Sequence, residues 1–200
     1  MHLTADNWLL SAGVFTPLAG VLVMLFLPRA RELEIKVVAL VVSVVTLAFG
    51  IVTLARFDYD QAGTLQFYAN TKWIEVIHSR YIVGIDGVSL PLYLLSMVIV
   101  VLCIIYSWDH IPEPGNPKAF LILILVLEVG MNGTFVAQDL ILFFVFFEVV
   151  LLPMYFMIGV WGGEQRQYAS LKFFLYTMFG SALMLIAWRA PAAASCRRCA

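Results

Sequence analysis

Charged residues and cysteines are scarce in this chain. Of its 200 residues only 12% are Asp, Glu, Lys or Arg, three are cysteine, and the formal net charge is −1. The first 187 residues contain no basic stripe, no glycine-rich phosphate loop and no zinc-type spacing of cysteine and histidine. We therefore expect no nucleic-acid partner, no metal site and no cofactor bound by this chain.

Apolar residues make up 62% of the chain, which is more than a soluble domain of this size can bury. A helix of about 20 apolar residues crosses a bilayer, whereas an open sheet edge in lipid would leave backbone groups unpaired. The predicted fold class is therefore an all-α membrane protein with about six transmembrane helices, forming one polytopic membrane domain over residues 1–187. The spans are predicted near residues 8–27, 35–55, 88–108, 119–137, 140–160 and 171–187.

Basic residues predict the orientation of these spans. No Lys or Arg precedes the first apolar run, which indicates an uncleaved first helix rather than a signal peptide. The odd-numbered connections carry more basic residues than the second connection: Arg29, Arg31, Lys36, Lys118, Arg166 and Lys172 against Arg56, Lys72 and Arg80. Because basic loops stay in the cytoplasm, we expect the N-terminus on the outer side.

The long connection over residues 56–85 is predicted to be an outer loop. Alternation in TLQFY and KWIEV suits a short hairpin there, and His78 is interpreted as an ordinary surface histidine. Asp86 and Asp139 stand just before the third and fifth spans, so both are predicted to cap helix N-termini. Asp139 has a second interpretation as the outer end of a polar path, since it enters the same helix as Glu148.

Two carboxylates interrupt the apolar spans. Glu128 lies ten residues before Gln138, at the turn between the fourth and fifth spans, and Glu148 lies ten residues after it. At a rise of about 1.5 Å per residue, both carboxylates lie about 15 Å from that surface, at the bilayer midplane. A charge there costs at least about 2.5–3.5 kcal/mol, and such residues normally face the protein interior.

A low dielectric and a nearby second carboxylate both favour the protonated form of a carboxyl group, and a coupled pair titrates as a unit. This chemistry suits a protein that passes protons. The alternative is a protonated glutamic acid that bonds a backbone carbonyl and only ties helices together. For Glu128 we leave both interpretations open, whereas for Glu148 we favour proton transfer. The sequence does not fix whether the two residues face each other.

Pro153 supports a functional interpretation of Glu148. Proline has no N–H, so the carbonyl of Val149 loses its partner and the helix has a deformable, hydrated point beside the carboxylate. Tyr155 lies on the same face, as packing or as an extension of the polar line. Lys172 opens the sixth span, either snorkelling to the headgroups or pointing inward to bias the glutamates, with Tyr176 one turn further.

Two long segments resemble a known family. LILFFVFFEVVLLPMYFMIGVWGG followed by YASLKFFLYTMFGSALMLIA is similar to the M subunit (chain 4) of proton-translocating NADH:quinone oxidoreductase, respiratory complex I, in its proteobacterial form, and GIDGVSLPLYLLS also fits. The resemblance implies the N-terminal portion of a larger antiporter-like helical bundle. It also implies that Glu148 matches the proton-channel glutamate, with Lys172 in a supporting role and Glu128 as a tentative addition.

The resemblance further implies function, partners and location. The chain would help translocate protons during NADH oxidation and quinone reduction, and NAD, FMN, iron–sulfur clusters and quinone would bind in partner subunits. The partners would be other membrane-arm subunits and the lipid of a bacterial inner membrane, with the N-terminus in the periplasm. The alternatives are a subunit of a multi-subunit sodium/proton antiporter or membrane-bound hydrogenase, and an inactive truncated fragment.

The C-terminal residues 188–200 depart from the family pattern. The run WRAPAAASCRRCA follows LMLIA, where the family continues in apolar residues, and it suggests a shifted reading frame. Cys196 and Cys199 form a C-x-x-C spacing, but no second pair or βαβ context supports a metal or redox role. Cys103, inside the third span, is predicted to pack in the core.

Overall fold

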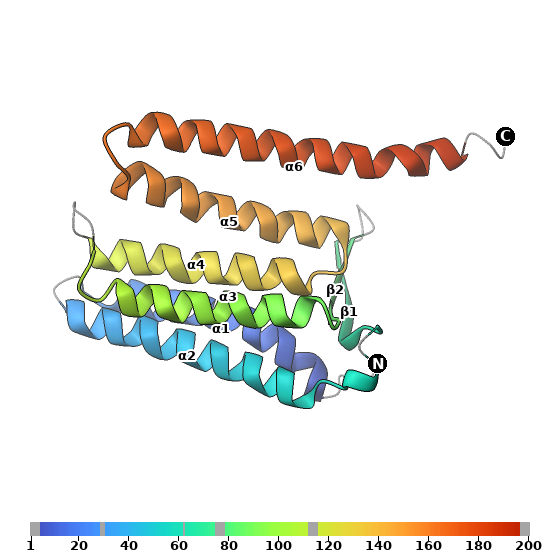
Figure 1. The fold of residues 1–200 in the computed structure, drawn as a ribbon, viewed down its shortest axis with the longest axis horizontal. Helices are drawn as coiled ribbons and strands as arrows, with labels where there is room; N and C mark the ends of the chain where they lie inside the picture. Colours follow the sequence, from blue (N-terminus) through green and yellow to red (C-terminus); the bar gives the residue numbers. More distant parts are fainter. Residues whose placement is uncertain (1–4, 29–30, 62, 75–78, 112–115, 197–200) are drawn as a thin grey trace. The chain divides into compact units, whose positions relative to one another are not determined.

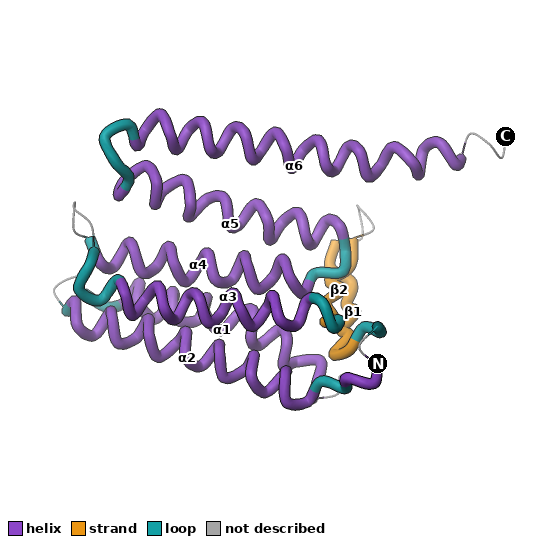
Figure 2. Tube along the Cα trace, viewed as in Figure 1, coloured by secondary structure: helices purple, strands orange, loops and turns teal. Residues whose placement is uncertain are grey.

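The computed structural model describes residues 5–28, 31–61, 63–74, 79–111 and 116–196. Within this part six helices are long and apolar enough to cross a membrane, which confirms the predicted fold class (Figures 1 and 2). The elements are α1 (Ala5–Phe26), α2 (Glu32–Arg56), a 3-10 turn (Tyr59–Gln61), β1 (Gln66–Ile74), β2 (Ser79–Ile85), α3 (Ser89–Tyr106), α4 (Pro117–Val136), α5 (Leu140–Trp161) and α6 (Arg166–Cys196).

The chain divides into two compact units, Met1–Met154 and Tyr155–Ala200, and α5 contributes to both. In the first unit α1 contacts α2 and α4, and α3 contacts the same two helices. This ring of contacts makes α1 to α4 a four-helix bundle, with a further contact between α2 and α4. The second unit consists of the end of α5 and α6.

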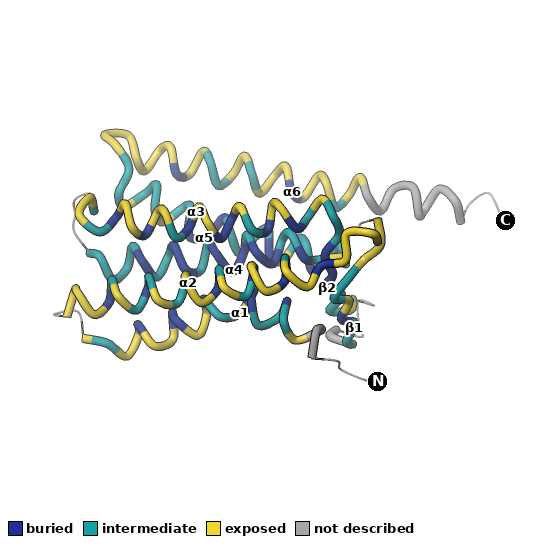
Figure 3. Tube along the Cα trace, turned by 60° about the horizontal axis from the view of Figure 1, so that its bottom comes forward, coloured by how far each residue is buried: buried dark blue, intermediate teal, exposed yellow. Residues whose placement is uncertain are grey.

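Helix α2 shows how the bundle is adapted to lipid. Its buried stripe is mostly small or polar and recurs every three or four residues, whereas its exposed face carries valine and isoleucine (Figure 3). The hydroxyls of Thr46 and Thr53 donate to the carbonyls of Val42 and Phe49 within the helix, at 3.0 and 2.9 Å. Small side chains let membrane helices approach closely, because lipid gives no hydrophobic force that drives helices together.

Asp86 caps a helix, as predicted, and Asp139 occupies the position before another helix. The Asp86 carboxylate accepts a hydrogen bond from the Ser89 N–H at 2.7 Å, and the Asp86 N–H donates to the Ser89 Oγ at 3.0 Å. The Asp86 carbonyl also accepts from the Leu90 N–H at 3.1 Å, so the hydrogen-bonded turn of α3 begins before its assigned start at Ser89. The Asp139 carbonyl accepts from the Phe143 N–H at 2.8 Å, which places Asp139 at the N-cap of α5.

The outer loop forms the expected hairpin, but its two strands are not the two segments named from the sequence. TLQFY and the start of KWIEV lie in or beside the same strand, β1, and the partner strand is β2, with Asn70 opposite Ile82. The predicted pairing was wrong because the chain between the two segments stays extended. The Gln138 N–H donates to the Ile82 carbonyl at 2.9 Å, so β2 is attached to the α4–α5 connection. Residues 75–78, among them His78, lie outside the described residues.

In the second unit, α6 begins at Arg166, before the predicted start of the sixth span, and extends to Cys196. The ring of Tyr155 meets that of Phe174 edge to face at 5.5 Å, and Ser170 lies close to Gly159. The side chains beyond Ala187 lie outside the described part of the chain. The prediction of an unrelated tail at residues 188–200 therefore stays a prediction.

Candidate functional site

Glu128 lies inside the four-helix bundle of the first unit. Its side chain is 0% exposed, and its Oε2 accepts a hydrogen bond of 3.2 Å from the hydroxyl of Ser43 on α2, which is also fully buried. The carboxyl group therefore connects α4 to α2. This contact supports the interpretation of Glu128 as a tie between helices, and it also places the group in a medium where a proton-binding role is physically reasonable.

Further polar groups surround Glu128. Asn132 lies one turn along α4, and its Oδ1 accepts a 2.8 Å hydrogen bond from the hydroxyl of Ser96 on α3. Tyr93 lies one turn before Ser96 on α3 and is 0% exposed. Polar side chains from α2, α3 and α4 thus meet in the centre of an otherwise apolar bundle.

Three buried atoms in this cluster have no hydrogen-bond partner within the described part of the chain: the Tyr93 hydroxyl, Glu128 Oε1 and Asn132 Nδ2. Leaving a buried polar group unsatisfied costs about 1–3 kcal/mol. Such groups in a folded protein call for an explanation, either a function or a further partner. Our sequence analysis missed Ser43, Tyr93, Ser96 and Asn132, although each is a polar residue inside a predicted span.

Glu148 and Glu128 point in different directions. On α5, Phe146 and Val150 contact α4 at Gly130 and Gly133. Glu148 lies two residues from each of these contact residues, and two residues turn a helix by about 200°, so Glu148 lies on the opposite face of α5. Glu128 is likewise two residues from Gly130, so it lies on the face of α4 that is turned away from α5, and there it contacts Ser43 of α2. The structure therefore does not bring the two carboxylates together, and Glu148 is only partly buried.

Pro153 is buried inside α5, and the helix continues through it to Trp161. A deformable point beside Glu148 stays a prediction. In the second unit, Lys172 is exposed, with its Nζ 5.8 Å from the ring centroid of Tyr168. Tyr176 is also exposed, and Tyr155 packs on Phe174, which is the packing interpretation.

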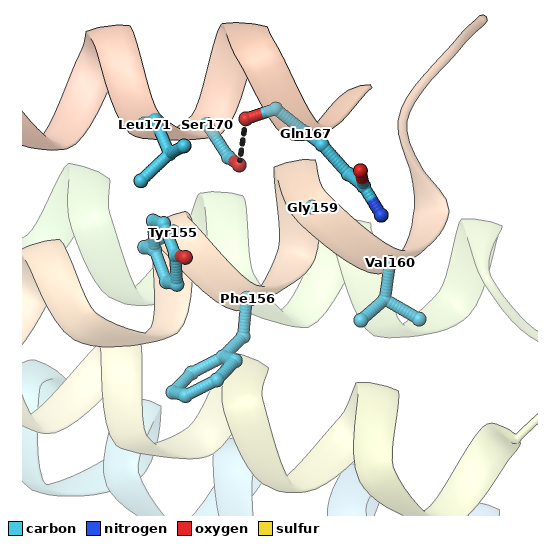
Figure 4. A pocket seen from close by; sticks show the side chains of 7 residues that line it. All are labelled: Tyr155, Phe156, Gly159, Val160, Gln167, Ser170 and Leu171. Atoms are coloured by element: carbon cyan, nitrogen blue, oxygen red, sulfur yellow. Dashed lines mark hydrogen bonds between the residues drawn. The ribbon is translucent and has the colours of Figure 1, made fainter. Parts of the chain in front are cut away.

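A cavity of about 340 Å³ lies between the end of α5 and the start of α6 (Figure 4). The Ser170 hydroxyl points into it but donates to the Gln167 carbonyl at 3.0 Å. The remaining lining is mostly apolar: Tyr155, Phe156, Gly159, Val160 and Leu171. Among the described residues no group of three or more His, Cys, Asp or Glu side chains is placed to hold a metal ion.

Two lysines used to predict orientation also have structural partners. Lys118 donates through Nζ to the carbonyls of Leu25 and Leu27 at the end of α1, at 3.1 and 2.7 Å. Lys36 donates to the carbonyl of Trp108, beyond the end of α3, at 2.6 Å. Both satisfy carbonyls that a helix end leaves without partners. Cys103, by contrast, was predicted to pack in the core but is exposed, because it lies on the lipid-facing side of α3.

Two family models match the chain. Residues 13–134 match the amino terminus of NADH-ubiquinone oxidoreductase chain 4, and residues 137–190 match the NADH:quinone oxidoreductase/Mrp antiporter transmembrane family. The first match covers well over half of the chain. The chain belongs to the NADH-ubiquinone oxidoreductase chain 4 family. The predicted resemblance is therefore confirmed.

Individual chain 4 relatives are similar over most of this chain. It is 43% identical over 183 residues to NADH-quinone oxidoreductase subunit M of Rhodobacter capsulatus, covering 90% of this chain and 35% of the relative. It is 37% identical over 179 residues to NADH-ubiquinone oxidoreductase chain 4 of Arabidopsis thaliana, covering 89% and 36%. The chain thus spans about a third of the length of these curated relatives.

The fold is also similar to that of a chain in a solved respiratory complex I. A chain of respiratory complex I from Thermus thermophilus with bound NADH superposes with a TM-score of 0.72 and 25% identity, covering 89% of this chain and 34% of that one. Glu148, Pro153 and Lys172 fall in the segment matched by the antiporter family model, and Glu128 falls in the segment matched by the chain 4 amino terminus.

Proposed function

We propose that this chain acts within the membrane arm of NADH:quinone oxidoreductase and takes part in proton translocation coupled to NADH oxidation and quinone reduction. Membership of the chain 4 family and the six apolar helices support this proposal. In it, other membrane-arm subunits are the partners, and NAD, FMN, iron–sulfur clusters and quinone bind to partner subunits. The chain itself carries out no redox catalysis.

The position of Glu148 carries the proposal. It lies in the middle of α5, on the face opposite the residues that pack on α4. An ionised group at that depth costs at least about 2.5–3.5 kcal/mol unless protein or water surrounds it. We propose that Glu148 is the proton-translocating residue and that charge changes in neighbouring subunits bias it. Lys172 supports it electrostatically, Glu128 is a second proton-binding carboxyl group, and Pro153 gives α5 a deformable point beside Glu148.

The replacement Glu148→Gln in the full-length gene tests this proposal. It keeps the size of the side chain and removes the titratable group, so the complex should assemble and lose NADH-driven pumping, measured by dye quenching in inverted membrane vesicles. The matched control is Glu34→Gln, because Glu34 pairs with Arg31 at 3.0 Å on the exposed end of α2. Normal pumping by the Glu148 variant would remove the site from the mechanism.

We also propose that the protein resides in a bacterial inner membrane with its N-terminus in the periplasm. The support is the excess of basic residues in the odd-numbered connections. Single cysteines introduced at Asp58 in the outer loop and at Glu164 in the fifth connection would test it with a membrane-impermeant maleimide. Labelling from the periplasm at position 58 but not at position 164 is expected, and the reverse pattern would overturn the orientation.

A sodium/proton antiporter function is the second candidate, because the description of the family matched at residues 137–190 also names the Mrp antiporter. The two functions differ in the driving reaction. Proton movement that needs NADH and stops with a quinone-site inhibitor supports the oxidoreductase. Proton movement that follows an imposed sodium gradient without NADH supports the antiporter.

A further inference from the structure

Three buried polar atoms of the first unit have no hydrogen-bond partner in the described part of the chain, and they lie on two adjacent helices. They are the Tyr93 hydroxyl on α3 and, on α4, Glu128 Oε1 and Asn132 Nδ2, and all three side chains are 0% exposed. Two of these atoms are donors and one is a carboxyl oxygen. A water molecule can accept from both donors and donate to the oxygen, so the set matches its hydrogen-bonding capacity.

The contacts of neighbouring atoms bring the set to one place. Glu128 and Asn132 are one turn apart on α4, and their other polar atoms bond to Ser43 on α2 and Ser96 on α3. Tyr93 is one turn from Ser96, whose hydroxyl also lies 2.7 Å from the Tyr93 carbonyl. The three atoms therefore surround the junction of α2, α3 and α4, at the depth of Glu128.

Helix α1 closes the fourth side of this junction. The Tyr93 hydroxyl lies against Gly13, where a Cβ atom would overlap it. A glycine at this position therefore leaves room for the hydroxyl inside the bundle. Tyr93 is 0% exposed, so its hydroxyl lies inside the bundle against α1 and not in lipid.

Tyr93 is also connected towards the outer hairpin. Tyr81 on β2 packs against the core cluster that contains Tyr93, and the Tyr81 hydroxyl lies 3.1 Å from the hydroxyl of Ser11 on α1. Within the described spans, residues 8–26 of α1 and 37–55 of α2 carry no titratable side chain. Over these ranges, therefore, neither α1 nor α2 places a titratable side chain beside Glu128.

We propose that Tyr93, Glu128 and Asn132 bind a buried water molecule, and that Tyr81 and Tyr93 connect this water to the hairpin end of the bundle. The water relieves the three unsatisfied atoms, because it restores hydrogen bonds that burial takes from them. The proposal concerns Glu128 and its own access route, and it stands independently of the role of Glu148.

Infrared spectroscopy of the full-length protein in its native membrane tests the water site. A water O–H stretching band that shifts in H₂¹⁸O is expected in the native protein and in Tyr106→Phe, a control on the exposed face of the same helix. The band should be lost in Tyr93→Phe, which keeps the ring, and in Asn132→Leu. A native protein without the band, or a band that persists in both variants, would overturn the site.

The connection to the hairpin has a separate test. In Tyr81→Phe the water remains bound, but its exchange with D₂O should slow on the order of tenfold, the effect of losing one hydrogen bond along the route. Exchange in Tyr106→Phe should match the native rate. Equal rates in all three proteins would overturn the connection while leaving the water site in place. Both readouts are independent of pumping, so a failure here is distinguishable from a failure of the proposed function.

Discussion

Gly133 fixes how closely α5 approaches α4, and Gly133→Ala tests this packing. A Cβ atom at this position would overlap the ring of Phe146, which is only 7% exposed and belongs to the core cluster. Overpacking of this kind costs about 1–3 kcal/mol, whereas alanine gains about 0.5–1 kcal/mol over glycine inside a helix. We expect a net loss on the order of 1–2 kcal/mol in the free energy of unfolding.

Reversible unfolding in mixed detergent micelles, followed by circular dichroism, measures this loss. The matched control is Gly180→Ala on α6, where a Cβ atom meets nothing within 4 Å, so stability should stay the same or rise slightly. Adding Phe146→Leu to Gly133→Ala should recover stability, because the smaller side chain removes the overlap. The reasoning is refuted if Gly133→Ala is as stable as Gly180→Ala, or if Phe146→Leu lowers the stability of the double variant further.

Two further predictions concern helix ends. Hydrogen bonds from the backbone N–H and hydroxyl of Ser89 hold the pKa of Asp86 below its usual range. The stabilisation of the fold by the Asp86 carboxylate is therefore complete above the ordinary aspartate pKa of about 4, and it is lost as the pH falls through the lowered pKa. Asp86→Ala should lower the free energy of unfolding by about 1 kcal/mol at pH 7 and by little at pH 2. An equal loss at both pH values would contradict this. Lys118→Met should cost about 1 kcal/mol, measured by unfolding, since the carbonyls of Leu25 and Leu27 lose their donor; an unchanged stability would show that solvent serves them equally well.

Hydropathy alone predicted where the helices lie, because each span must satisfy its own backbone hydrogen bonds in lipid. The local chemistry of Asp86 also sufficed to predict a cap, since capping involves only the next three residues. The hairpin shows the limit of such local patterns. Alternation predicted strands, but the choice of partner for β1 depends on the turn and on the attachment of β2 to Gln138, which lies far along the chain.

The candidate site shows the same limit at the level of helix rotation. Counting residues placed Glu128 and Glu148 at one depth, but a membrane helix apolar on all sides carries no periodic signal that fixes its rotation. Gly130 and Gly133 decide it here, because only their missing side chains let α5 approach α4 on that face. The two carboxylates are thereby turned apart, one into the bundle and one away from it.

The sequence by itself determined that the chain is a multi-pass membrane protein, which segments form the six long apolar helices of its described part, and the family to which it belongs. These properties follow from composition and from the fixed rise of a helix, which act along the chain. The tertiary structure decided which polar groups meet. Ser43 meets Glu128, and Ser96 meets Asn132, only when three helices pack, since contact between distant residues depends on the shape of the interfaces between them.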